Sequence, residues 1–322
     1  MTKTESEFST ASSEAIFGSS ARGDTDQMSD RDILIVDEDV SVLRARSKVL
    51  KAAGWSVASY TFAKLDALAE RGALFIQHLK LESTITIDRN ERLRTRLERF
   101  EPRSDYASEI GDNDQLASLA GIMPDSPSAP LLSADILYVT VRNFGVLKLA
   151  ERGIHVYSYD HVLRELERSG FISPGSSRHL SALRFLKCLY RSGEDAAASR
   201  AKILIADALR SLPSDHFPSR LKLVDPLSFL KAPCPPDSGP AYLQLRDLER
   251  RYLALKSIGL TPEQSLQFDR LSEWIKNPRA YSFVSGLLAP ELRLDMYRIA
   301  EHLDQGSQSA MGRAQFASRH SS

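Results

Sequence analysis

The chain has 322 residues, enough for one large domain or two domains of ordinary size. Its 42 Lys and Arg residues equal its 42 Asp and Glu residues, so the net charge gives no general attraction to nucleic acid or to a membrane surface. The hydrophobic content of 42% is typical of a folded globular protein, which excludes a wholly disordered chain.

The cysteine count and the hydropathy indicate in which cellular compartment the protein is expected. Cys188 and Cys234 are the only two cysteines, and their spacing fits neither a metal site nor a disulfide framework. No run of about 18 apolar residues is present, so no membrane span is expected. The first residues also lack the basic and apolar regions of a secretory signal. These observations predict a cytoplasmic protein that does not contact a membrane.

Both ends of the chain are poor in apolar residues. Residues 1–30 are rich in Ser, Thr, Gly and acids, and residues 305–322 have a similar composition. Such segments bury too little apolar surface to offset the entropy of ordering. They are predicted to be disordered tails.

Residues 31–172 alternate predicted strands with predicted helices. Strands are expected at "DILIVD" (32–37), "WSVASY" (55–60), 84–87, "ADILYVTV" (134–141) and "IHVYSY" (154–159). The helices between them include 61–72, for which Thr61 is a suitable N-cap. Alternation of this kind is typical of a parallel sheet covered by helices on both faces. The prediction is a Rossmann-like three-layer α/β domain.

Residues 173–304 show helical periodicity and almost no strand signal. Leu180, Leu183 and Leu186 recur at helical spacing, and "TPEQ" at 261–264 has an N-cap, a first-turn proline and a capping-box glutamine. An all-helical C-terminal domain is therefore predicted, and its surface is a candidate site for a protein partner.

Two acid clusters are candidate metal ligands. Asp37, Glu38 and Asp39 follow the first predicted strand, and Asp112 and Asp114 stand at the start of a predicted helix. Carboxylates that meet at the carboxyl edge of a parallel sheet can hold Mg²⁺ or Mn²⁺ and activate water. The first cluster is also compatible with a solvated strand end and a helix cap, which is slightly favoured over the metal site, and less so with a salt-bridge network. Capping is also an interpretation of the second cluster.

Several motifs in order resemble a PIN domain, a metal-dependent nuclease fold. They are "ILIVDEDV", "VASYTFAKLDAL", "GDNDQLASLA", "ADILYVTVRNF" and "ERGIHVYSYDHVLRELERSGFIS". The resemblance implies cleavage of RNA or of single-stranded nucleic acid with Mg²⁺ or Mn²⁺. It implies Asp37 and Asp112 as catalytic residues, and Asp37, Asp39, Asp112 and Asp114 as metal ligands.

The chain departs from the PIN pattern at two acidic positions. Lys64 stands where the family has a helical Glu, and Val141 and Arg142 follow Thr140 where the family has Asn or Asp. Lys64 or Arg142 could replace a cation among the acids. The resemblance therefore also implies a degenerate, non-catalytic module.

The stretch "ILIVDEDVSVLRARSKVLKAAGWSVASY" also resembles the start of a two-component receiver domain. Gln77 and His78 stand where that family has its phosphate-accepting Asp. The alternative to a nuclease is therefore a receiver-like or PIN-like regulatory module that binds a protein partner.

Overall fold

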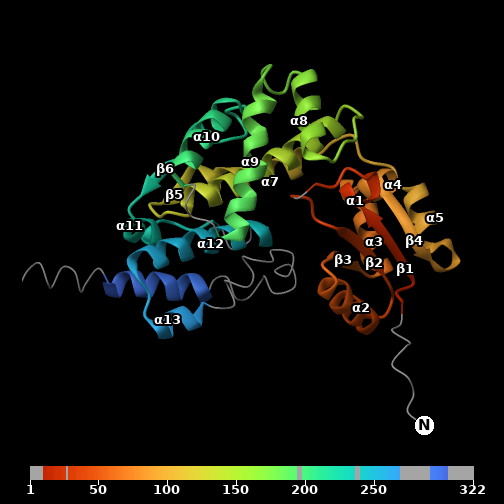
Figure 1. Cartoon of the computed structure of the whole chain (residues 1–322), viewed down its shortest axis with the longest axis horizontal. Coiled ribbons are helices and arrows are strands. Elements are labelled where there is room, and N and C mark those ends of the chain that lie inside the picture. The colour runs from red at the N-terminus through yellow and green to blue at the C-terminus, as the bar shows by residue number, and fades with distance from the viewer. Residues whose placement is uncertain (1–9, 27, 194–197, 236–239, 269–290, 304–322) are drawn as a thin grey trace, which may run out of the picture. The chain divides into compact units, whose positions relative to one another are not determined.

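The structure is a computed structural model that describes residues 10–26, 28–193, 198–235, 240–268 and 291–303 (Figure 1). It is a mixed α/β protein with a largely helical second region. The chain forms two compact units. Unit 1 comprises Met1–Glu109 and Arg142–Ser169, and unit 2 comprises Ile110–Val141 and Gly170–Ser322.

A four-stranded sheet forms the centre of unit 1. Its strands are β1 (Ser13–Phe17), β2 (Asp32–Val36), β3 (Ser56–Tyr60) and β4 (Ser83–Asp88). The spatial order is β3-β2-β1-β4. β2 and β3 are parallel, whereas β1 is antiparallel to both of its neighbours. The sheet is therefore mixed rather than fully parallel, although three of its strands lie where the sequence predicts them.

The central position of β1 corrects the prediction of a tail over residues 1–30. Composition does not predict this strand, because its apolar run is only Ala15, Ile16 and Phe17 and the charged Glu14 directly precedes it. Glu14 is nevertheless buried, and Arg46 donates to both of its carboxylate oxygens at 2.8 and 2.9 Å. A paired carboxylate of this kind can enter a protein interior at moderate cost.

Most helices of unit 1 lie where the sequence predicts them, but those at Ser19–Arg22 and Leu74–Glu82 were not predicted. Asp39 caps α2 through the Ser41 amide, and the Thr61 hydroxyl accepts from the Lys64 amide at the start of α3, as predicted. The helices are α1 (Ser19–Arg22), α2 (Val40–Ala52), α3 (Phe62–Glu70), α4 (Leu74–Glu82), α5 (Arg92–Arg99) and α8 (Tyr159–Arg168), with a 3-10 turn η1 (Arg89–Glu91).

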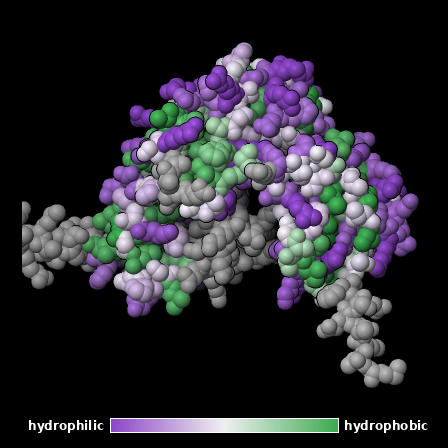
Figure 2. All heavy atoms as spheres, in the orientation of Figure 1, coloured by the Kyte–Doolittle hydropathy of each residue, from purple (hydrophilic) through white to green (hydrophobic). Residues whose placement is uncertain are grey.

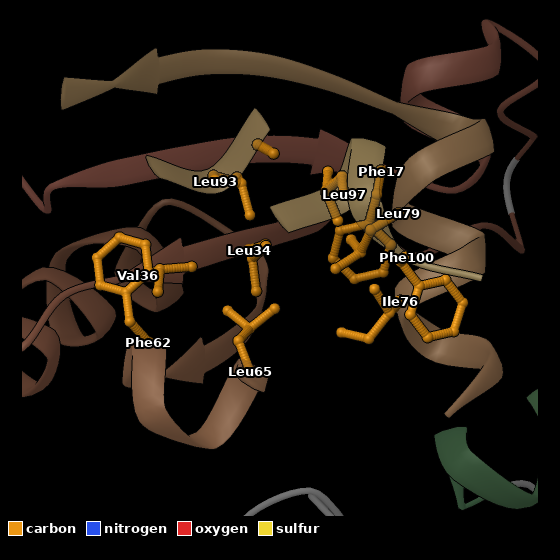
Figure 3. Close-up of a cluster of buried hydrophobic side chains, with 11 residues drawn as sticks. Phe17, Leu34, Val36, Phe62, Leu65, Ile76, Leu79, Leu93, Leu97 and Phe100 are labelled. Atoms are coloured by element: carbon orange, nitrogen blue, oxygen red, sulfur yellow. The ribbon is translucent and has the colours of Figure 1, made fainter. Parts of the chain in front are cut away.

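The alternation of side chains along the strands gives the sheet two apolar faces. Ile33 and Ile35 pack with Leu43 and Leu50 of α2 on one face. The opposite face packs against α3, α4 and α5, whose side chains point toward the strands in Figure 3. That cluster contains Ala15, Phe17, Leu34, Val36, Phe62, Leu65, Ile76, Leu79, Leu93, Leu97 and Phe100. Unit 1 is thus three-layered around its sheet.

Two strands predicted near the end of the α/β region are absent. "ADILYVTV" lies inside α7 (Ala129–Ala150), and "IHVYSY" is irregular until α8 begins at Tyr159. A continuous apolar run does not distinguish a buried strand from a helix that is buried all round. α7 is of the second kind, with Leu132, Leu137 and Val141 all buried.

Unit 2 is mainly helical where it is described, as predicted for the region after residue 172; it also contains Ile110–Val141, which the sequence predicted to belong to the α/β domain. Its helices are α6 (Ala107–Ser118, from residue 110), the first half of α7, α9 (Ser176–Ser192), α10 (Ala198–Arg210), α11 (Pro226–Lys231), α12 (Ala241–Ile258) and α13 (Pro262–Gln267), with a 3-10 turn η2 (Leu119–Gly121). Residues 291–303 are also helical. The expected capping box of α13 is present at Thr261 and Gln264. A short parallel pair, β5 (Ile122–Pro124) with β6 (Lys222–Val224), was not predicted.

The surface is mostly polar where it can be seen. Hydrophilic residues cover much of the described part of the face in Figure 2, with apolar residues scattered among them. Within the described ranges, no helix combines the length and the apolar character needed to cross a bilayer.

Candidate functional site at the end of β1

Asp37 is tied into the chain that leads to β1. Its carboxylate accepts from the amide and the hydroxyl of Ser12, each at 2.7 Å, and from the Asp39 amide at 2.9 Å. Burial alone would raise the pKa of Asp37, but these hydrogen bonds outweigh it and lower the pKa below its usual value. Asp37 therefore has a structural role at the carboxyl end of β2.

The two neighbouring acids also have protein partners. Asp39 accepts from the Ser41 amide at 2.7 Å as the cap of α2, and hydrogen bonds with Ser41 lower its pKa. Glu38 is exposed and forms an ion pair with Arg92. Asp39 is thus accounted for by a helix cap and Glu38 by an ion pair, and both are among the interpretations given for this cluster.

Asp112 and Asp114 lie in the middle of α6 rather than at its start, so the predicted capping role is wrong. The helix begins at Ala107, five residues before Asp112. Asp112 is exposed, and Asp114 pairs with His216 at 2.9 Å. Both acids belong to unit 2, whereas Asp37 and Asp39 belong to unit 1.

Of the two basic residues that interrupt the PIN pattern, one is exposed to solvent and the other binds a backbone carbonyl. Lys64 is exposed in the first turn of α3. Arg142 donates through Nε to the carbonyl of Tyr157 at 3.1 Å. Arg142 thus anchors the segment between α7 and α8.

A second acid cluster lies at the opposite end of β2, where three chain segments meet. Phe17, the last residue of β1, is paired with Asp32 of β2 on one side and with Ser83 of β4 on the other. The next amide, that of Gly18, donates to the Glu82 carbonyl at 3.2 Å. Asp32 and Glu82 are therefore brought to the same end of the sheet, on either side of β1.

The turn after β1 places a residue without a side chain next to the Asp32 carboxylate. Gly18 has φ 68°, a left-handed conformation that favours glycine, and a Cβ there would lie 3.5 Å from Oδ2 of Asp32. Asp30 is exposed and precedes Asp32 by two residues, the spacing that puts side chains on one side of an extended segment. Two carboxylates thus border a turn that has no side chain of its own.

Hydroxyl groups begin the short helix that follows the turn. Ser19 donates to the Asp30 carbonyl at 3.5 Å, which ties α1 to the segment before β2. The hydroxyl oxygen of Ser20 is buried and has no hydrogen-bond partner among the described residues. The turn therefore offers amide and hydroxyl donors next to the carboxylates.

Glu82 is held by two basic side chains. Arg22 of α1 forms an ion pair with it, and Nε2 of His78 lies 3.2 Å from Oε2. Burial would raise the pKa of Glu82, but His78 and Arg22 together lower it below its usual value. Glu82 is therefore a carboxylate at neutral pH and is unsuited to act as a general base near pH 7.

Aromatic packing fixes the position of His78. Its ring stacks on Tyr157 with centroids 4.3 Å apart and meets Phe17 edge-on at 5.7 Å. Burial raises the pKa of the Tyr157 hydroxyl above its usual range. The Glu82–His78 pair thus belongs to one helix, α4, and its imidazole packs between two aromatic rings.

The sequence contains a signal for this site in "FGSS" (17–20) and "SDRD" (29–32). The composition of residues 1–30 predicts a tail, so it gives no strand before Gly18 that would place these residues at a sheet end. Among the described residues, no three His, Cys, Asp or Glu side chains are grouped as a metal site. No family model, curated protein or solved structure matches the chain.

Proposed function

We propose that unit 1 catalyses a divalent-metal-dependent nucleotidyl transfer at the Gly18 turn. In this reaction a hydroxyl oxygen of an acceptor bonds to the α-phosphorus of a nucleoside triphosphate and gives up its proton to solvent, while the bond to the β-phosphate breaks and pyrophosphate leaves. The observation that carries the proposal is the 3.5 Å approach of the Asp32 carboxylate to the position of a Gly18 Cβ. This approach places carboxylates that suit a hard cation beside a turn that suits phosphate, both at one end of the sheet.

The carboxylates of Asp30 and Asp32 fit Mg²⁺ or Mn²⁺. Mg²⁺ prefers oxygen ligands, and in phosphoryl-transfer sites it is commonly bound by one or two carboxylates together with substrate phosphates. A bound cation would neutralise charge on the transferring phosphate. Asp30 and Asp32 would orient that cation from the end of β2, which is anchored in the sheet core at Leu34 and Val36.

The Gly18 turn supplies the contacts that a triphosphate needs beyond the cation. Without a side chain at Gly18, phosphate oxygens can approach the backbone closely. The hydroxyls of Ser19 and Ser20 follow at once, and the second of these lacks a hydrogen-bond acceptor in the described structure. These donors favour a polyphosphate substrate over a single phosphodiester.

Arg22 and Glu82 would balance charge around the bound phosphates. The Arg22 guanidinium bridges Glu82 and Asp24, the latter at 3.0 Å. An arginine held in this way keeps one orientation and retains donors for an anion. We assign Arg22 a binding role and Glu82 a positioning role.

The test compares two matched substitutions at opposite ends of β2. Purified full-length protein is incubated with each α-³²P-labelled nucleoside triphosphate and Mg²⁺ or Mn²⁺, and released pyrophosphate and labelled products are followed. Asp32→Asn is expected to lower the rate at least 100-fold, because it removes a charge that holds the cation. Asp37→Asn is expected to stay within a few-fold of wild type once folding is confirmed by circular dichroism. Equal rates for Asp32→Asn and wild type would overturn the proposal.

The nuclease hypothesis is tested in the same experiment. It uses Asp37 and Asp39 with Asp112 and Asp114, and exposed Asp39 at the carboxyl end of β2 is the observation in its favour. Mn²⁺-dependent cleavage of single-stranded RNA that is abolished by Asp37→Asn but retained by Asp32→Asn would support it instead. Absence of both activities would favour a regulatory module that binds a protein through its helical unit.

The proposed reaction is compatible with a cytoplasmic location. Neither Cys188 nor Cys234 forms a disulfide. Free thiols are the usual state of cysteines in a reducing compartment such as the cytoplasm.

A further inference from the structure

Unit 2 contains an open pocket of about 490 Å³ that is separate from the Gly18 turn in sequence and in structural unit. It lies between the second half of α6, the start of β5 and the loop that leads into β6. A volume of several hundred cubic ångströms is typical of sites for small organic ligands. The pocket residues used below are Asp114, Ile122, His216, Phe217, Pro218, Arg220 and Lys222.

The pocket is held in shape from three sides. Nδ1 of His216 lies 2.9 Å from Oδ2 of Asp114, which ties the loop to α6. Gly121 packs so closely on the loop that a Cβ there would lie 2.7 Å from Cβ of Pro218. Ile122 is paired with Lys222 between β5 and β6. These contacts preform the site, which lowers the cost of binding.

Three polar groups of the pocket have no partner among the residues that the structure describes, namely one oxygen of Asp114 and the charged groups of Arg220 and Lys222. The second oxygen of Asp114, Oδ1, is buried and has no hydrogen-bond partner in the described ranges. The exposed Arg220 and Lys222 side chains form no hydrogen bond or ion pair with the residues that the structure describes. Buried acceptors are usually paired, so a lone carboxylate oxygen beside a cavity indicates a missing donor.

The apolar part of the pocket wall indicates that part of the ligand is apolar or planar. Ile122 is 50% exposed although it is a large aliphatic residue, and it stands beside Phe217 and Pro218. A planar or apolar group packed there would be removed from water. The pocket thus combines an apolar wall with two cations and an unsatisfied acceptor.

We infer that this pocket binds a mononucleotide. The phosphate would pair with Arg220 and Lys222, the base would pack against Ile122 and Pro218, and the sugar hydroxyls or a base amine would donate toward Asp114. Arg suits phosphate because its planar guanidinium donates two parallel hydrogen bonds. The inference stands independently of the reaction proposed for unit 1.

The test measures binding of AMP, GMP, CMP and UMP to the full-length protein by isothermal titration calorimetry without added divalent metal. At least one nucleotide is expected to bind, and the double variant Arg220→Gln/Lys222→Gln is expected to weaken its binding at least tenfold. The matched control Arg200→Gln/Lys202→Gln makes the same change of charge on the exposed surface of α10 and is expected to bind like wild type.

A third variant separates this site from that of unit 1. Asp32→Asn, in unit 1, is expected to bind the mononucleotide as tightly as wild type. Absence of binding by all four nucleotides at millimolar concentration would overturn the inference. Equal weakening in the α10 control would also overturn it, because binding would then follow net charge. Loss of binding in Asp32→Asn with retention in Arg220→Gln/Lys222→Gln would assign the nucleotide to unit 1 instead.

Discussion

Arg246 and Asp135 form an ion pair inside unit 2, and neither side chain is exposed to solvent. Arg246 also pairs with buried Glu249, and Arg191 reaches Asp135 at 2.6 Å. Burial would raise the pKa of Asp135, but the charges of Arg246 and Arg191 lower it below its usual value. The charged side chains of α12 thus occupy the interior of unit 2 and compensate one another there.

Removal of the Asp135 charge is expected to be strongly destabilising. Asp135→Asn leaves Arg246 and Arg191 without their shared carboxylate, and a buried charge that loses its partner costs about 3–5 kcal/mol. The control Asp207→Asn breaks the exposed pair with Arg210 and is expected to cost less than about 1 kcal/mol. Urea unfolding of both variants measures the difference. Equal effects would show that the network in unit 2 does not depend on Asp135.

Gly145 of α7 lies against α8 within unit 1. A Cβ at Gly145 would lie 2.2 Å from Cγ1 of Val162 and 3.0 Å from Cδ1 of Leu166, so Gly145→Ala forces the helices apart and is expected to cost about 1–3 kcal/mol. Gly111 of α6 has open space around its Cα, and Gly111→Ala is expected to raise stability by roughly 0.5–1 kcal/mol through helix propensity. Thermal unfolding of the two variants should therefore shift in opposite directions, and a shared direction would contradict the packing argument.

The stability contributed by Asp37 is expected to depend on pH. Its folded-state pKa is lowered, so the contribution is complete above the unfolded-state pKa of about 3.9 and is lost as pH falls through the folded-state value. Wild type should be more stable than Asp37→Asn at pH 7, and the gap should narrow as the pH falls below about 4. Urea unfolding at pH 7, 5 and 3.5 tests this, and a gap that widens in acid would refute the hydrogen-bond account.

Gly18 and Gly23 allow backbone strain to be separated from loss of function. Their φ angles are 68° and 77°, so alanine at either position is strained and is expected to cost about 1 kcal/mol. Only at Gly18 does a Cβ approach the Asp32 carboxylate, whereas nothing lies within 4 Å of a Cβ at Gly23. Gly18→Ala should therefore lower nucleotidyl transfer at least tenfold, while Gly23→Ala leaves the rate near wild type. Similar rates in the two variants would show that the Gly18 turn does not take part in the reaction.

Much of the local structure could be predicted from the sequence. The buried run "ILIV", the Thr61 cap and the capping box at Thr261 each predicted an element that the structure contains. These signals are local, because a cap or a period depends on residues within one or two turns. The helical character of the second region follows from the same kind of signal.

The sequence by itself thus determined strands β2 to β4, helices α2 and α3 and the helical character of the region after residue 172. Tertiary structure alone decided that Glu14 enters the interior beside Arg46, that the apolar run at 134–141 is a helix, and that Gly18, Asp32 and Glu82 share one sheet end. The physical reason is that these outcomes depend on partners distant in the chain. Local periodicity does not encode such contacts. They decide whether a buried charge is paired, whether a helix is buried on all sides and which register two antiparallel strands adopt.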